Sequence, residues 1–143
     1  MKQLYFICIA IFMSAISCTS AKESMQQTTP LYDTKWSLKK VYNNGKEETV
    51  NTKAFIRFDQ QKGSAGGNGS CNSFGSNATI NGNEVGFKNI FSTKMYCEGI
   101  QPMEDLFLGD LGQVDRFEIK DNKLFLYKDK ELLLEFEGEV LSE

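Results

Sequence analysis

The feature of this sequence that most constrains the fold is a run of small residues from Gly63 to Phe74. The run holds four glycines within its first seven positions, followed by a cysteine, Cys71. Glycine adopts positive φ angles and lets another segment or a ligand come close, but it loses more conformational entropy on folding than other residues do. We therefore expect an irregular loop here, whose entropic cost is offset by a ligand or by a cross-link through Cys71.

Short strands separated by turns account for most of the remaining chain. Trp36 and Leu38 alternate with polar residues, and such alternation indicates a half-buried strand. Asn81-Gly82 is a strong β-hairpin signal between two further runs. The expected strands are residues 34–42, 53–59, 77–80, 84–87, 116–119, 123–127 and 132–136.

One segment, roughly residues 102–114, has the pattern of a helix. Pro102 suits a first helical turn, and the carboxylates of Glu104 and Asp105 complement the positive end of the helix dipole. Apolar residues recur there at helical spacing: Met103, Leu106, Phe107, Leu111 and Val114.

These elements predict a mainly β fold, a small antiparallel, lipocalin-like β-barrel with one α-helix over an end or a face. So many short strands usually close into a barrel or sandwich, because open sheet edges favour aggregation. A parallel α/β sheet would need several more helices. Aromatic residues are spread along the chain and are expected to fill the interior, among them Phe55, Phe58, Phe87 and Phe117.

The first 17 residues have the layout of a lipoprotein signal peptide. A basic start, an apolar run of about ten residues and a small-residue end precede Cys18. The end resembles a bacterial lipobox, in which the cysteine carries the lipid, although Ala15 stands where leucine is usual. The alternative is a plain secretory signal whose cleavage leaves Cys18 free or removes it.

The domain organisation follows from this start. Residues 1–17 are expected to be the signal peptide, residues 18–33 the lipidated cysteine with a flexible polar spacer, and residues 34–138 one folded domain. Thr19 rather than aspartate follows Cys18, which favours the outer membrane. The expected location is the cell envelope, where the lipid at Cys18 tethers the domain to a membrane.

Cys71 and Cys97 form an even pair in the exported part of the chain. Such a pair is typical of a disulfide in an exported protein. Residues 89–97 are expected to be an extended connection that returns Cys97 to the glycine-rich run. A reduced buried pair and a redox-active pair are the alternatives, although a nucleophilic cysteine needs a base or a lowered pKa and the chain has no histidine.

Composition disfavours several classes of function. A net charge of −3 without a long basic block argues against nucleic-acid binding. The absence of histidine removes the commonest general base and zinc ligand, and no acidic cluster selects a metal. We therefore expect no metal, no cofactor and no catalysis. Glu104 has two open roles, a general acid and, more typically for a helix start, a carboxylate that meets the helix dipole.

The glycine-rich run has a structural and a binding interpretation. It lacks the Lys-Ser/Thr of a phosphate-binding P-loop, and Asn72 stands where a dinucleotide fingerprint has Gly or Ala. The favoured interpretation is therefore structural: a tight turn of the glycine-rich run, close to another segment and held there by a disulfide. Exposed backbone in the run would still offer a candidate interaction loop, made of Gly66, Gly67, Asn68, Gly69 and Asn72.

Several motifs in order resemble the META domain, the family of HslJ-like heat-shock lipoproteins. They are Trp36-Ser-Leu38, Ile56-Arg-Phe58, Gly69-Ser-Cys-Asn72 with Phe74, Ser92-Thr-Lys-Met-Tyr-Cys97 and Glu104. One departure is Ser70, where the family more often has glycine. The resemblance implies a small β-barrel with one helix, an envelope location, a link to heat stress or antibiotic tolerance, and no settled enzymatic activity.

Two functional hypotheses remain after these steps. The first is a non-enzymatic envelope lipoprotein, monomeric in its domain, that binds an unknown envelope protein or component in stress tolerance. The second is a small-ligand binding protein that uses the barrel interior, as lipocalin-like barrels do. A barrel interior filled by aromatic side chains would argue against the second.

Overall fold

Antiparallel strands and one helix make up residues 28–141, the part of the chain that the computed structural model describes. In chain order the elements are β1 (Thr34–Asn43), β2 (Lys46–Thr49), β3 (Phe55–Asp59), β4 (Ser64–Asn68), β5 (Ser73–Asn81), β6 (Glu84–Ser92), α1 (Gln101–Leu111), β7 (Arg116–Lys120), β8 (Lys123–Lys128) and β9 (Glu131–Val140).

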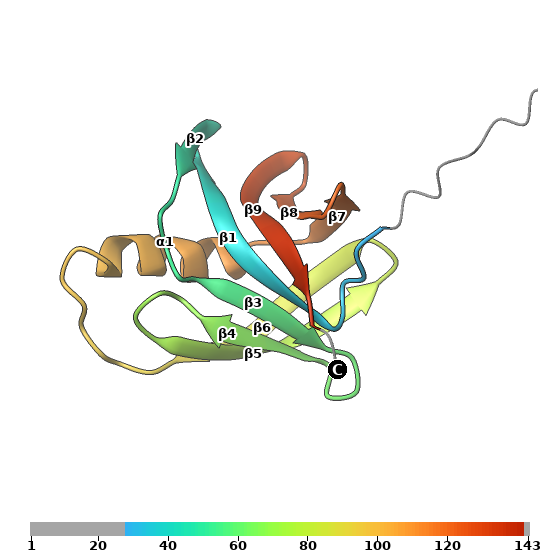
Figure 1. The fold of residues 1–143 in the computed structure, drawn as a ribbon, viewed down its shortest axis with the longest axis horizontal. Helices are drawn as coiled ribbons and strands as arrows, with labels where there is room; N and C mark the ends of the chain where they lie inside the picture. Colours follow the sequence, from blue (N-terminus) through green and yellow to red (C-terminus); the bar gives the residue numbers. More distant parts are fainter. Residues whose placement is uncertain (1–27, 142–143) are drawn as a thin grey trace, which may run out of the picture.

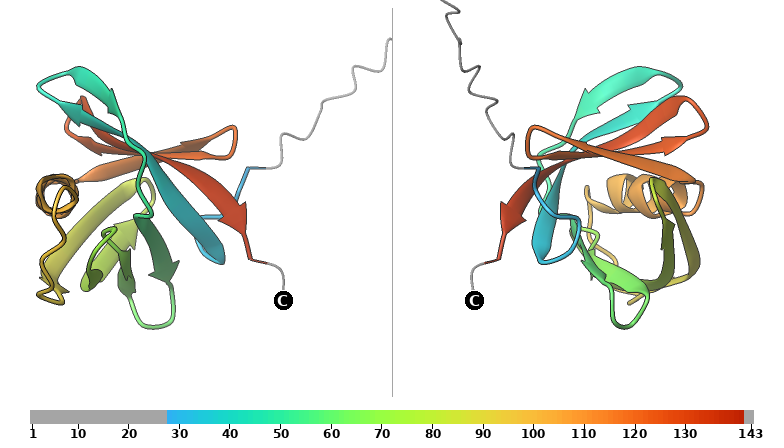
Figure 2. Two further views of the ribbon diagram at one scale, coloured as in Figure 1. Left: turned by 60° about the vertical axis from the view of Figure 1, so that its left-hand side comes forward. Right: turned by 90° about the vertical axis from the view of Figure 1, so that its right-hand side faces the viewer.

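The strands form a ring (Figures 1 and 2). From β3 to β9 each strand pairs with the next in sequence, and β1 closes the ring by pairing with both β3 and β9, while β2 extends from β1 alone. The weakest junction is between β6 and β7, which share a single residue pair, Glu84 with Arg116. The prediction of a mainly β, antiparallel, barrel-like fold with one helix is confirmed.

Helix α1 connects β6 to β7, and its Phe107 side chain packs into the interior of the ring. The Phe107 ring lies 5.5 Å from the Phe74 ring of β5 and 6.2 Å from the Phe136 ring of β9, measured between centroids. Figure 2 shows the helix at the side of the ring, between the β5–β6 part and the β8–β9 part. The helix therefore bridges the poorly paired side of the ring with apolar contacts.

Large side chains fill the inside of the ring. Trp36, Phe107 and Phe136 are fully buried, and the Trp36 indole N–H donates to the Leu31 carbonyl at 2.9 Å. Together with Ile56, Leu124, Leu126 and Leu134, also fully buried, they belong to one continuous core.

Two of the four phenylalanines expected inside the ring are placed differently. Phe58 and Phe87 are buried and their rings lie 6.0 Å apart. Phe117 is half-buried, and Phe55 points outward, where Lys35 and Arg57 lie over its ring. The reason for the Phe55 error is strand periodicity: its neighbour Ile56 occupies the inward position, so Phe55 must face out.

The glycine-rich run is mostly strand, which corrects the expectation of a loop. Gly66 and Gly67 lie in β4 and pair with β3 and β5. A Cβ atom at Gly66 would lie 2.8 Å from the Phe74 carbonyl oxygen, and one at Gly67 would collide with the Phe55 carbonyl. These glycines let neighbouring strands approach closely, and the irregular turn is confined to residues 69–72.

Other boundaries differ from the expected ones for local reasons. Helix α1 ends at Leu111 instead of residue 114, because Gly112 forms its C-cap, and Val114 is buried beyond the helix. Strand β2 was not expected, since Lys46–Thr49 carries no apolar residue; all four of its residues are exposed. Strand β6 continues to Ser92, so only the second half of the 89–97 connection is irregular.

Candidate functional site

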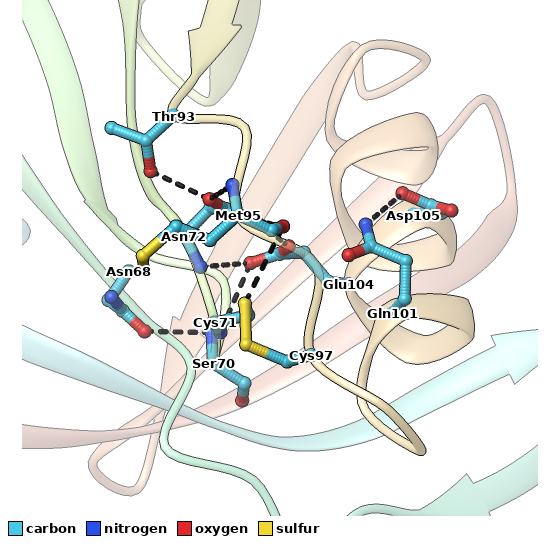
Figure 3. The surroundings of a disulfide bond; sticks show 10 residues. All are labelled: Asn68, Ser70, Cys71, Asn72, Thr93, Met95, Cys97, Gln101, Glu104 and Asp105. Atoms are coloured by element: carbon cyan, nitrogen blue, oxygen red, sulfur yellow. Dashed lines mark hydrogen bonds between the residues drawn. A yellow bond between two sulfur atoms is a disulfide. The ribbon is translucent and has the colours of Figure 1, made fainter.

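A disulfide joins the β4–β5 turn to the segment that precedes α1. Cys71 and Cys97 are bonded, with their Cα atoms 6.0 Å apart. The expected pairing is therefore confirmed. The bond fixes the segment between β6 and α1 against the end of the ring, as Figure 3 shows.

Glu104, in the first turn of α1, places a buried carboxylate beside this disulfide. Only 1% of the residue is exposed. Its Oε1 accepts the backbone N–H of Cys71 at 3.2 Å and of Asn72 at 2.6 Å, and its Oε2 accepts the Asn72 side-chain amide at 2.7 Å (Figure 3). Gly69 is required here, because a Cβ atom would lie 2.5 Å from Oε1. Of the two roles considered for Glu104, this geometry supports a structural one, since both oxygens are held by protein donors.

Asn72 extends the same network to the segment after β6. Its Oδ1 accepts the Thr93 hydroxyl at 2.7 Å and the Met95 backbone N–H at 2.8 Å. Its Nδ2 donates to the Met95 carbonyl at 3.0 Å as well as to Glu104. The side-chain amide of Asn72 therefore both donates to and accepts from the Met95 backbone, as a paired strand residue would, and it holds residues 93–95 in place.

In the candidate interaction loop, Gly66, Gly67 and Asn68 are half-buried. Gly69 and Asn72 are buried, and the Asn68 side chain accepts the Ser70 backbone N–H at 2.8 Å. Ser70 has a φ of 99°, at the position where the resembled family more often has glycine. With Gly66 and Gly67 in β4, the polar groups of this stretch serve the fold itself.

The exposed feature beside this network is a set of large apolar side chains. Phe91 is 70% exposed, Met95 59% and Tyr96 79%. We name these three residues the 91–96 surface. Asn72 holds the backbone at Met95, and the disulfide holds it at Cys97. The exposed side chains of Met95 and Tyr96 are therefore attached to a fixed backbone segment. Sequence reasoning missed this surface, since nothing in the pattern of residues 89–97 shows which side chains meet solvent.

A small hollow of about 200 Å³ lies next to this segment. Its lining includes Thr93, Lys94, Tyr96, Gln101 and Asp105. The Gln101 amide donates to Asp105 Oδ1 at 2.9 Å, while its Oε1 is buried without a hydrogen-bond partner among the described residues.

A second buried carboxylate, Glu135 of β9, lies on the outer face of the ring. Lys123 donates to its Oε1 at 2.8 Å, the Tyr42 hydroxyl donates to its Oε2 at 3.1 Å, and Lys40 lies 3.8 Å from Oε2. Burial acts to raise the pKa of Glu135, but the hydrogen bonds from Lys123 and Tyr42 outweigh it and the pKa is lowered. Burial and the bond to Glu135 raise the pKa of Tyr42 to about 12.

A third carboxylate, Asp110 in α1, has no such partners. Its Oδ2 is buried and unpaired among the residues that the structure describes. Burial, with a smaller contribution from the nearby Glu131 carboxylate, raises the pKa of Asp110 to about 6.

Two negative findings concern residues 28–141 alone. Within them, no three side chains of the His, Cys, Asp or Glu type are gathered as metal ligands. Over the same residues, no helix has the length and apolar character that crossing a membrane requires. Cys18 and the expected signal peptide lie outside the described residues.

Comparison with solved structures identifies proteins of the same fold. A protein from Burkholderia xenovorans solved by NMR aligns with a TM-score of 0.65 at 20% identity, over 76% of this chain and 83% of that one. A second NMR structure gives 0.55 at 21% identity, over 73% and 88% of the two chains. A DUF4847 family protein from Bacteroides vulgatus gives 0.55 at 14% identity, over 78% and 96%. No curated protein matches the chain.

A family model supplies the assignment. The META domain model matches residues 29–140, most of the chain and all ten elements of the fold. The match includes both cysteines of the disulfide, Glu104 and Asn72, so the buried network described above lies within the family's own domain. The resemblance noted from the motifs is confirmed, and the chain belongs to the META domain family.

Proposed function

We propose that this protein is a cell-envelope lipoprotein, anchored through Cys18, whose META domain binds a partner protein or envelope component in tolerance of heat or antibiotic stress. The observation that carries the binding role is the 91–96 surface. Exposed apolar side chains that lie together mark interaction sites, and Met95 and Tyr96 line one surface hollow. Tyr and Met are also enriched in protein interfaces relative to the rest of the surface.

A binding role fits the buried polar groups better than catalysis does. The carboxylate of Glu104 and the amide of Asn72 are both held by protein groups and almost wholly buried. A general acid or base must instead reach a proton of the substrate. The network is best understood as the support of the exposed segment.

The alternative hypothesis, a carrier of small ligands inside the ring, receives no support from the packing. Trp36, Phe107 and Phe136 occupy the interior and are fully buried. Hollows of about 580 and 590 Å³ lie on the outside, one between residues 49–53 and the start of α1 and the other beside β6 and β7.

Site-specific photocrosslinking in intact cells tests the binding role. A photoreactive phenylalanine analogue would replace Tyr96 in one strain and Val140 in another. Val140 is the matched control, because it is 56% exposed and apolar but lies at the end of β9. We expect a discrete crosslinked product from position 96, stronger under heat stress and absent from position 140. Equal crosslinking from both positions would contradict the proposal.

The anchor is tested separately by labelled fatty acid. The wild-type chain is expected to take up the label, and a Cys18→Ala variant is expected to lose it. Label that persists in the variant would refute an anchor at Cys18 while leaving the binding role open.

A further inference from the structure

The position of Phe91 follows from the register of four strands. On the outer face, Arg57 of β3 pairs with Gly66 of β4, Gly66 with Gly75 of β5, and Gly75 with Phe91 of β6. The Phe91 ring lies over Gly75, where a Cβ atom would come within 2.7 Å of it. The absence of a side chain at Gly75 thus lets the Phe91 ring pack against the strand, while most of the Phe91 side chain stays exposed to solvent.

Cations border this aromatic side chain without carboxylate partners. Lys88 pairs across the sheet with Asn77, on the same outer face as Phe91, and Lys94 lies between Phe91 and Tyr96 in sequence. Both lysines are exposed. Among the described residues, neither of them nor Arg57 has a carboxylate within ion-pair distance, although Arg57 lies against the Phe55 ring.

By contrast, the lysines around Glu135 and Glu137, on the other side of the ring, have carboxylate partners. Lys39 pairs with Glu137 at 3.0 Å, Lys40 with Glu47 at 2.9 Å, and Lys123 with Glu135 at 2.8 Å. In the hollow that Met95 and Tyr96 line, the Asp105 carboxylate accepts the Gln101 amide. Glu98 is exposed two residues after Tyr96. Although the chain has a net charge of −3, two exposed lysines without ion-pair partners border these side chains: Lys88 shares the outer face with Phe91, and Lys94 lines the same hollow as Met95 and Tyr96.

The surface also lies away from both ends of the described chain. Figures 1 and 2 show residues 28–31 and the C-terminal end on one side of the ring and the β6–α1 connection on the other.

We propose that the 91–96 surface binds an acidic peptide segment of the partner, in which Asp or Glu stands next to aromatic or aliphatic residues. The inference rests on the proposed binding function and specifies its partner. The apolar side chains of the segment cover Phe91, Met95 and Tyr96, and its carboxylates meet Lys88 and Lys94. Electrostatic complementarity of this kind sets partner choice and association rate more than total affinity.

Selection from a displayed library of random 12-residue peptides tests the proposal. The bait is the full lipid-anchored chain in nanodiscs of uncharged zwitterionic lipid, with empty nanodiscs for counter-selection. We expect enriched sequences that combine Asp or Glu with Phe, Tyr, Trp or Leu. Backbone amide NMR shifts on adding the best peptide are expected at residues 88–96.

Paired charge reversals identify the role of the lysines. A Lys88→Glu/Lys94→Glu variant is expected to bind the best peptide about tenfold more weakly, equivalent to about 1.4 kcal/mol of binding free energy. Lys120→Glu/Lys128→Glu is the matched control, because both lysines are exposed on the β7–β8 hairpin, and it should change affinity less than twofold. Thermal unfolding of each variant confirms that the fold is retained.

The outcomes separate this inference from the function on which it rests. Peptides that bind at residues 88–96 but are neutral or basic would overturn the acidic specificity and leave the binding role standing. Direct binding of the chain to anionic nanodiscs through Lys88 and Lys94 would identify a lipid surface as the partner and overturn the proposal of an acidic peptide. If no peptide depends on Phe91 or Tyr96, tested as Phe91→Ser and Tyr96→Ser, both proposals fail.

Discussion

Two buried carboxylates stabilise opposite parts of this domain, and they differ in the donors that hold them. Glu104 accepts two backbone N–H groups and one side-chain amide at the end of the ring. Glu135, on the outer face of β9, accepts hydrogen bonds from a lysine and a tyrosine side chain. The donors of Glu104 are buried, whereas the Lys123 side chain is 47% exposed.

This difference decides what each carboxylate contributes. Buried backbone donors that lose their acceptor stay unsatisfied, and each costs about 1 to 3 kcal/mol. A half-exposed lysine that loses its partner returns to water at little cost. The region around Glu104 should therefore be fragile toward substitution, while the region around Glu135 should be tolerant. The same contrast extends to the surface, since the lysines near Glu135 are paired and those near Phe91 are free for a partner.

The largest expected effect is that of Glu104→Ala. Removing the carboxylate leaves the N–H groups of Cys71 and Asn72 and the Asn72 amide without their acceptor, and we expect the free energy of unfolding to fall by about 4 kcal/mol. Urea denaturation measures the change. Asp105→Ala, one residue along the helix and exposed, is the control and should change stability by less than about 0.5 kcal/mol. Equal losses in the two variants would refute the contrast.

Loss of the disulfide should come next in size. Cys71 and Cys97 are separated by 26 positions, and closing such a loop stabilises the fold by about 3 to 4 kcal/mol on the chain-entropy model. We expect Cys71→Ser/Cys97→Ser to lose about that much in urea denaturation. Hydrogen exchange should rise first at residues 93–97. Uniform exchange across the ring would show that the bond does not act specifically on the segment that carries Met95 and Tyr96.

Alternation of apolar residues was enough to predict most of the ring. Strands β1 and β3 appear where Trp36, Leu38 and Ile56 alternate with polar residues, because inward positions repeat every second residue. Strand β4 could not be found in this way. Its central residues Gly66 and Gly67 have no side chain to alternate, and only the proximity of the Phe74 and Phe55 carbonyls shows why a strand needs glycine there.

The candidate site was predictable only in part. An even cysteine pair predicts the disulfide, and an acidic residue after Pro102 predicts a helix start. The contact of Glu104 with Asn72 spans 32 positions, and no local pattern encodes such a distance. Exposure of Phe91 was also hidden, because an aromatic residue in a β-rich domain is ordinarily a core residue.

Asp110→Asn tests a carboxylate that has neither kind of partner. The folded-state pKa of Asp110 is raised from 3.8 to about 6, so the folded protein binds its proton more tightly than the unfolded chain does. The contribution of Asp110 to stability should therefore fall as pH rises from about 4 through about 6, and the loss is complete above that range. The variant avoids this loss, and we expect it to be more stable by about 1 to 2 kcal/mol at pH 8. Urea denaturation from pH 4 to pH 8 measures the gain, which should vanish at pH 4. A gain independent of pH would contradict the explanation, and Asp105→Asn serves as the exposed control.

The smallest effect is expected for Glu135→Gln, at about 1 kcal/mol or less near neutral pH. Lys40 would return to water, and the glutamine oxygen can still accept a hydrogen bond from Lys123. The folded-state pKa of Glu135 is lowered below 4.5, so its contribution is present above that pH and is lost as pH falls through the folded-state value. The difference between wild type and variant should therefore shrink below pH 4.5, and also in 1 M salt, where the screening length is about 3 Å. Glu104→Ala should show no such sensitivity to salt, because its lost partners are uncharged backbone and amide donors. A large, salt-independent loss in Glu135→Gln would mean that the lysines of this face are held as firmly as the backbone donors around Glu104, and the contrast between the two carboxylates would fail.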